Sequence, residues 1–131
     1  MARAREYDLL FKNAILQFPE KNIYICDIQG FHRVTEDTFI FKEISFLNLR
    51  KTALPTVYLF KSPLRWDDLT REEKCTFQWL EKYYHGISWF SGDIPYNNLH
   101  RILQICTYGV KKIYVKGEQK VQWLRKMLPD M

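Results

Sequence analysis

The last third of the sequence holds the side chains best suited to binding an anionic ligand. Six basic residues fall between positions 111 and 126 of this stretch: Lys111, Lys112, Lys116, Lys120, Arg125 and Lys126. Tyr108, Tyr114 and Trp123 are interleaved with them. Basic groups can follow a phosphate backbone while aromatic rings stack on bases, so this pattern is typical of nucleic-acid binding. The alternative interpretation is a solvated helix face with Trp123 in the core or at an interface.

Nucleophilic and metal-ligating residue types are sparse and widely spaced. Cys26, Cys75 and Cys106 form no CxxC or CxH pair, so we expect no structural zinc site among them. Their odd number favours reduced thiols over disulfides. The spacing of Ser, His and Asp supports no nucleophilic catalysis, and no glycine-rich phosphate loop is present in the sequence. His85 precedes Gly86 and is expected to cap or pack at the end of a helix.

The composition predicts one folded domain of ordinary size. Of 131 residues, 47% are hydrophobic and 16% are aromatic, which is enough for a core and argues against disorder. The 20 basic and 15 acidic residues give a net charge of +5, which permits contact with nucleic acid or an acidic protein. No apolar run approaches the roughly 20 residues of a membrane helix. With no secretory signal in view, we expect a cytoplasmic or nuclear protein that does not enter membranes.

Eight elements are expected to position these groups, in the order α-β-β-β-α-α-β-α. Apolar spacings of three and four predict an N-terminal amphipathic helix within residues 1–20, ahead of a domain of residues 21–131. Three strands are predicted over residues 22–31, 39–47 and 55–60, with the first strand central because it is apolar on both faces. Strict alternation in the second strand would put Phe41 and Glu43 on one face and Lys42 and Ile44 on the other.

Four elements follow the third strand. Thr70 and Glu73 have the spacing of a capping box, which predicts a helix over residues 70–84 ended by Gly86. Pro95 suits the first turn of another helix, residues 112–116 are typical of a short strand, and Gly117 opens a last helix. This order predicts an α/β fold of RNase H-like type: a mixed sheet, made of an antiparallel three-stranded meander and a parallel strand, with flanking helices. A fifth strand would follow residue 131, so we expect a shortened version of that fold.

Three segments resemble DEDD-type 3′–5′ exonucleases. Residues 23–30 resemble their first motif, an apolar strand with Asp-x-Glu, and residues 113–124 resemble their second. Residues 85–87 with 95–99 resemble their "GI" step and the helix after it. The sequence is more closely similar, over about residues 22–128, to a group of arthropod proteins with an Asp-Ile-Gln-Gly-Phe strand, a His-Gly-Ile-x-Trp step and a Lys-Gly…Lys…Trp-Leu helix. That similarity implies a fold and allows an origin in a mobile element or a virus.

The exonuclease resemblance implies a two-metal site, and most of its ligands are missing. Such enzymes hold two divalent cations about 4 Å apart with four carboxylates. Asp27 matches the first carboxylate, Gln29 stands where a glutamate is expected, and Lys120 adds a positive charge near the metals. We expect Asp27 to be a strand-end carboxylate that is hydrogen-bonded to nearby amides or to the turn at Gly30, and Glu43 can form a cross-strand ion pair. The alternative is a vestigial site, whose candidate residues are Asp27, Gln29 and Glu43, with Asp27 as a weak ligand of Mg²⁺ or Mn²⁺.

These observations predict a non-catalytic exonuclease-like domain that binds a protein, RNA or DNA and needs no cofactor. The six basic residues of the last third are the candidate nucleic-acid contacts. The alternative is an active metal-dependent 3′–5′ exonuclease with unconventional ligands, completed by a second protomer. A homodimer through the N-terminal helix or an edge of the sheet is a further interpretation, because an uncovered edge strand can pair with another chain.

Overall fold

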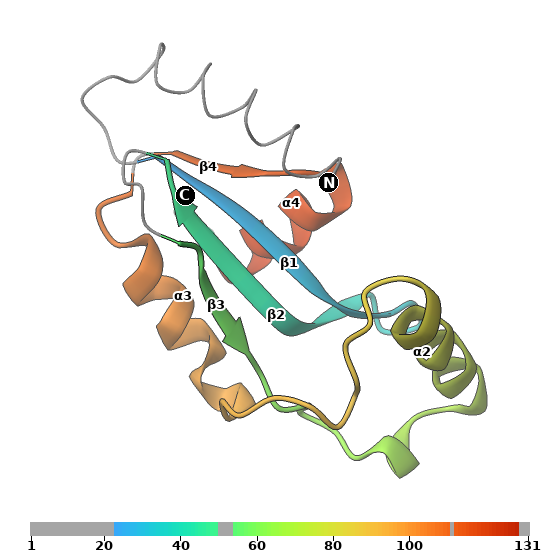
Figure 1. Cartoon of the computed structure of the whole chain (residues 1–131). Helices are drawn as coiled ribbons and strands as arrows, with labels where there is room; N and C mark the ends of the chain where they lie inside the picture. The colour runs from blue at the N-terminus through green and yellow to red at the C-terminus, as the bar shows by residue number, and fades with distance from the viewer. Residues whose placement is uncertain (1–22, 50–53, 111, 129–131) are drawn as a thin grey trace.

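The computed structural model describes residues 23–49, 54–110 and 112–128 (Figure 1). Within these ranges the chain forms a four-stranded mixed sheet with the order β3-β2-β1-β4. The antiparallel part consists of β1 (Ile23–Arg33), β2 (Thr38–Asn48) and β3 (Thr56–Leu59), and β4 (Lys112–Val115) runs parallel to β1. The α/β class, the meander, the parallel strand and the central place of β1 are confirmed. The helix predicted within residues 1–20 lies outside the described residues.

Among the described residues, three helices occupy the regions that the sequence predicts, and two of them follow 3₁₀ turns that it did not predict. A short 3₁₀ turn (Trp66–Asp68) precedes α2 (Arg71–Tyr83), and a second (Tyr96–Asn98) leads from Pro95 into α3 (Leu99–Thr107). The last helix, α4 (Glu118–Met127), begins after Gly117, whose φ of 99° is a conformation that favours glycine. The predicted order of elements is therefore confirmed from residue 23 onward. Within the part of the chain described, no helix combines the length and the apolar character needed to cross a lipid bilayer.

Two apolar clusters hold the helices against the sheet. The larger lies between the sheet, α3 and α4, and its buried members are Cys26, Ile28, Phe41, Ile44, Phe46, Phe60, Leu99, Leu103, Leu124 and Leu128. The second joins the hairpin end of the sheet to α2 and contains Phe31, Ile40, Leu69, Phe77 and Trp89. Side chains alternate along a strand, so Ile28 and Phe31 point to opposite faces of β1. Figure 1 accordingly shows α2 beside the turn between β1 and β2, with α3 and α4 along the sheet.

A β-bulge makes the predicted face assignment in β2 wrong. The register between β1 and β2 shifts between Gln29 and Gly30, which leaves Lys42 as the additional residue of β2. The bulge reverses the alternation, so Phe41 joins Ile44 in the larger core instead of lying on the opposite face. It also turns Lys42 into the interior, where its side chain has no exposed surface.

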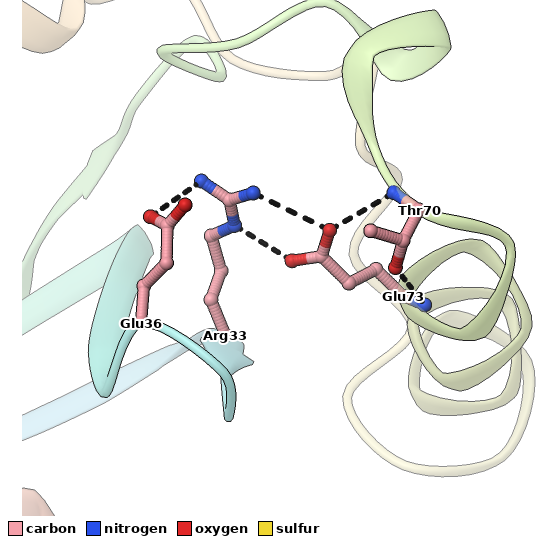
Figure 2. Close-up of polar contacts among 4 residues, drawn as sticks. All are labelled: Arg33, Glu36, Thr70 and Glu73. Carbon is pink, nitrogen blue, oxygen red and sulfur yellow. Dashed lines mark hydrogen bonds and ion pairs between the residues drawn. The ribbon is translucent and has the colours of Figure 1, made fainter.

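An arginine links the end of β1 to the start of α2 (Figure 2). Arg33 Nε donates to Glu73 Oε2 at 2.6 Å, and a terminal nitrogen donates to Glu36 at 2.9 Å. The Glu73 carboxylate also accepts from Thr70 N while Thr70 Oγ1 accepts from Glu73 N, which confirms the predicted capping box. The hydrogen bonds from Arg33 lower the pKa of Glu73 from its usual 4.5 to about 2. One carboxylate thus caps the helix and docks it on the sheet.

Candidate functional site

A cleft of about 490 Å³ opens beside β1 where β4 ends. The last pair between these strands joins Cys26 to Val115, so the following residues of β1 have no β4 partner and line the cleft instead. The turn between β4 and α4 and the end of α2 supply the other walls. In α/β sheets, ligands commonly bind in such a crevice outside the carboxyl ends of parallel strands.

Asp27 and Lys120 form an ion pair in this cleft. Lys120 Nζ lies 3.2 Å from Asp27 Oδ1, and Gln29 Nε2 donates to Asp27 Oδ2 at 3.4 Å. The side chains of Asp27 and Lys120 are only 10% and 17% exposed, so water screens their attraction weakly. The positive charge that the sequence predicted beside Asp27 is therefore confirmed.

The described donors do not fit a divalent cation. Mg²⁺ and Mn²⁺ prefer several oxygen ligands with negative charge among them. Across the described ranges, no three His, Cys, Asp or Glu side chains come together in a way that could hold a metal ion. Glu43 lies opposite Gln29 in the β1–β2 ladder, on the face that Asp27 shares, but the ammonium of Lys120 already compensates Asp27. Asp27 as a metal ligand stays a prediction.

The predicted basic residues are divided between several surfaces. Lys116 and Lys120 line the cleft. Lys112 and Arg125 line a separate groove of about 230 Å³ between β4 and α4. The cleft thus receives two of the six predicted nucleic-acid contacts, together with the acidic Glu118.

Of the other two members of that predicted set, the structure describes one. Lys126 Nζ is 3.6 Å from Asp37 Oδ2, beside the turn between β1 and β2. Lys111 lies outside the described residues. The described basic residues are therefore divided between the cleft, the groove and the turn after β1.

Aromatic rings form one side of the cleft. Trp123 stacks on Phe39 with ring centroids 4.1 Å and planes 9° apart, and the His32 ring lies 5.0 Å from Trp123. Trp123 is partly buried: it packs against the larger core and also lines the cleft. Tyr84 also lines the cleft and is 61% exposed, which leaves its ring accessible to a ligand. Sequence reasoning missed both His32 and Tyr84, because neither belongs to a recognisable spacing.

His85 covers the edge of β1 next to the cleft. Its Nε2 donates to Gly30 O at 3.1 Å, and its Nδ1 accepts from Ile87 N at 3.0 Å, an arrangement that requires the neutral imidazole with hydrogen on Nε2. The ring also packs edge-on against Phe31, with centroids 5.0 Å apart. Burial lowers the pKa of His85 below its usual 6.5. The predicted capping or packing role is confirmed.

Lys42, the bulge residue, lies in a polar cage that sequence reasoning also missed. Its Nζ lies within hydrogen-bond distance of four oxygens, Phe60 O and Ser91 O at 2.6 Å, Ser62 Oγ at 3.1 Å and Trp89 O at 3.2 Å, which its three N–H groups share. All four oxygens are neutral, and burial lowers the pKa of Lys42 from 10.5 to about 8. The ammonium therefore stays charged at neutral pH and ties β2 to the end of β3 and to the loop after α2.

No protein-family model matches the chain, and neither a curated protein nor a solved structure matches it at a significant level. The similarity to exonucleases and to the arthropod group therefore stays an expectation from the sequence. What the fold and the site define is a class: an α/β domain whose mixed sheet carries a lysine-containing cleft at the end of its parallel strand pair.

Proposed function

We propose that this chain is a non-catalytic domain of RNase H-like, exonuclease-type architecture that binds a single nucleic-acid strand in the cleft. The topology supports the architecture, because a three-stranded meander is followed by helices and then by a strand parallel to the first. The place of Asp27 supports it as well, since this residue of the first exonuclease-like motif lines the cleft at the end of β4.

The Asp27–Lys120 ion pair is the observation that carries this proposal. A two-metal nuclease needs several carboxylates to offset the charge of two dications. Here the carboxylate that matches the first motif lies 3.2 Å from an ammonium group of the same chain. A group compensated in this way gains little from a metal ion, which would also have to approach Lys120. The arrangement favours binding without hydrolysis.

The lining of the cleft favours nucleic acid as the ligand. Lys116 adds positive charge beside the compensated Asp27–Lys120 pair, and the first turn of α4 directs backbone N–H groups and the positive end of its dipole toward the same region. Tyr84 offers an exposed ring on which a base can stack. Phosphate at the start of α4 and a base on Tyr84 would together account for both kinds of side chain.

Binding assays at two salt concentrations test the ligand. We expect labelled single-stranded RNA or DNA to bind the full chain and to lose affinity about tenfold between about 50 and about 200 mM salt, as two or three phosphate contacts would require. Lys116→Gln and Tyr84→Leu should each weaken binding. Arg125→Gln is the matched control, because this cation lies in the other groove and its loss should leave the affinity nearly unchanged. Absence of binding at low salt would contradict the proposed ligand.

A cleavage assay tests the absence of catalysis. Labelled single-stranded and duplex substrates, incubated with the protein and Mg²⁺ or Mn²⁺, should remain intact. Cleavage that disappears in Asp27→Asn would show that the ion pair opens to admit metal, and would replace the proposed function with that of an active nuclease.

A further inference from the structure

A second cavity, of about 500 Å³, lies between residues 61–67 and the loop of residues 89–92. It shares no lining residue with the cleft beside β1. Trp66 and Phe90 form its aromatic side, with ring centroids 6.0 Å apart. Phe90 is 77% exposed, which is unusual for a phenylalanine. The fold therefore lacks the hydrophobic stabilisation that burial of this ring would provide. A side chain placed in this way requires an explanation from its surroundings.

The backbone on both sides of Phe90 is firmly held. Lys42 Nζ donates to the carbonyl oxygens of Trp89 and Ser91, the two neighbours of Phe90 in the sequence. Ser62 Oγ, which also binds Lys42, donates to the Trp89 carbonyl as well. The polar cage therefore holds the backbone of the loop that carries Phe90. A loop held in place before binding loses little backbone entropy on contact with a ligand.

The same cavity has an excess of positive charge. Lys61 and Arg65 line it, and both are exposed. Lys42 lies directly behind Ser62 and Trp89, and its hydrogen-bond partners are all neutral oxygens, so its charge is not cancelled locally. Asp67 is the one acidic residue among the described lining residues, at 3.8 Å from Arg65. Two cations of the lining, with the buried Lys42 behind them, against one carboxylate favour an anionic ligand.

We propose that this cavity binds one nucleotide of a single strand, with the base stacked on Phe90 beside Trp66 and the phosphate held by Lys61 and Arg65. A nucleotide combines a planar base with a phosphate, and the cavity combines the rings of Trp66 and Phe90 with the cations Lys61 and Arg65. The volume of the cavity suits a ligand of this size. The choice of a nucleotide rests on the proposed function, whereas the preference for an aromatic anion follows from the cavity alone.

Titration with a single nucleotide tests the proposal. Adenosine monophosphate is added to the full chain while the indole N–H resonances of the tryptophans are followed by NMR. We expect a saturable shift at Trp66, and Phe90→Leu should weaken binding about tenfold, as the loss of one stacking contact predicts. Lys61→Gln combined with Arg65→Gln should weaken binding and reduce its salt dependence. Tyr108→Leu is the matched control, because it removes an exposed ring outside the cavity.

The outcomes separate this proposal from the proposed function. If oligonucleotide binding depends on Tyr84 and Lys116 while Phe90→Leu changes neither nucleotide nor oligonucleotide affinity, the cavity is not a nucleotide site and the cleft stands. If the nucleotide binds the cavity and no oligonucleotide binds the cleft, the proposed function fails and the cavity stands. Saturable binding of a phosphotyrosine peptide, without binding of the nucleotide, would overturn the nucleotide assignment.

Discussion

The cleft and the polar cage stabilise the ammonium group of a lysine in different ways. In the cleft, Lys120 lies against the carboxylate of Asp27 at 3.2 Å. In the cage, Lys42 is fully buried and its Nζ is surrounded by four neutral oxygens of the backbone and of Ser62 within hydrogen-bond distance. Both arrangements satisfy the ammonium, because a charged donor needs either an opposite charge or a full set of hydrogen-bond acceptors.

The difference matters for what each region can bind. The ion pair offsets the charge of Asp27, which weakens the attraction of this carboxylate for a further cation, and the cleft retains the charge of its other side chains. The cage satisfies hydrogen bonds without cancelling charge, so the positive potential of Lys42 extends toward the neighbouring cavity. The comparison therefore predicts that removing Lys42 from the cage lowers the free energy of unfolding more than removing the Asp27–Lys120 ion pair does.

Replacing Lys42 is expected to have the largest effect. Lys42→Met keeps the length of the side chain but leaves the buried carbonyl oxygens of Phe60, Trp89 and Ser91 without this donor, at a cost of about 3 kcal/mol in the free energy of unfolding. Urea denaturation measures the loss. Lys61→Met, at an exposed neighbouring position, should change stability by less than about 0.5 kcal/mol. Equal effects of the two substitutions would show that the cage contributes nothing to stability.

The Arg33–Glu73 ion pair provides a second case of charge compensation. Its shortest N···O distance is 2.6 Å, compared with 3.2 Å between Lys120 and Asp27. The pKa of Glu73 is 4.5 in its ordinary state and about 2 in the folded chain, so the folded chain binds this proton more weakly than the unfolded chain does. The stabilisation is therefore complete above about pH 4.5 and disappears as the pH falls toward 2. Glu73→Gln should remove about 2 kcal/mol at pH 7 and much less near pH 2.

Chemical denaturation of the wild type and of Glu73→Gln at several pH values measures this difference. Glu36→Gln is the control, because Glu36 also contacts Arg33 but is 56% exposed, and exposed ion pairs contribute little. A stability difference between wild type and Glu73→Gln that stays constant between pH 7 and pH 2 would contradict the assigned cause.

The Asp27–Lys120 pair should show a smaller, separable coupling. A double-mutant cycle with Asp27→Asn and Lys120→Met isolates the pair from the other contacts of each side chain, and we expect a coupling of about 1 kcal/mol. The double variant should be closer in stability to the wild type than the two single losses added together. Additive losses would mean that the ion pair is incidental, and would remove the observation that carries the proposed function.

Local patterns in the sequence predicted the elements well. The capping box at Thr70 and Glu73, the glycine before α4 and the apolar run of β1 each act through neighbours in the chain, so their consequences can be read without a structure. The parallel pairing of β4 with β1 followed from element order alone. The existence of a charge beside Asp27 was predicted from the motif that contains Lys120.

The missed features depend on contacts between distant residues. The bulge that buries Lys42 is a property of the β1–β2 register, and alternation along β2 by itself predicted a regular strand. The cage joins Lys42 to Ser91, and the cavity joins Trp66 to Phe90, which no spacing rule connects. Sequence reasoning could have flagged Lys42 only by asking why a lysine interrupts a strand of apolar residues.

His85 differs from Lys42 and Lys120 because its side chain is held in the neutral form, so no charge has to be compensated. Protonation of Nδ1 would break the hydrogen bond from Ile87 N, and burial opposes the charged imidazole, so its pKa lies below the usual 6.5. Stability from His85 is therefore present above about pH 6.5 and is lost as the pH falls through the lowered pKa. NMR titration of the imidazole resonances should give His85 a midpoint below that of a peptide of residues 83–88, about 6.5. A midpoint at or above the peptide value would mean that the ring accepts a second proton in place, and that this edge of the cleft carries charge.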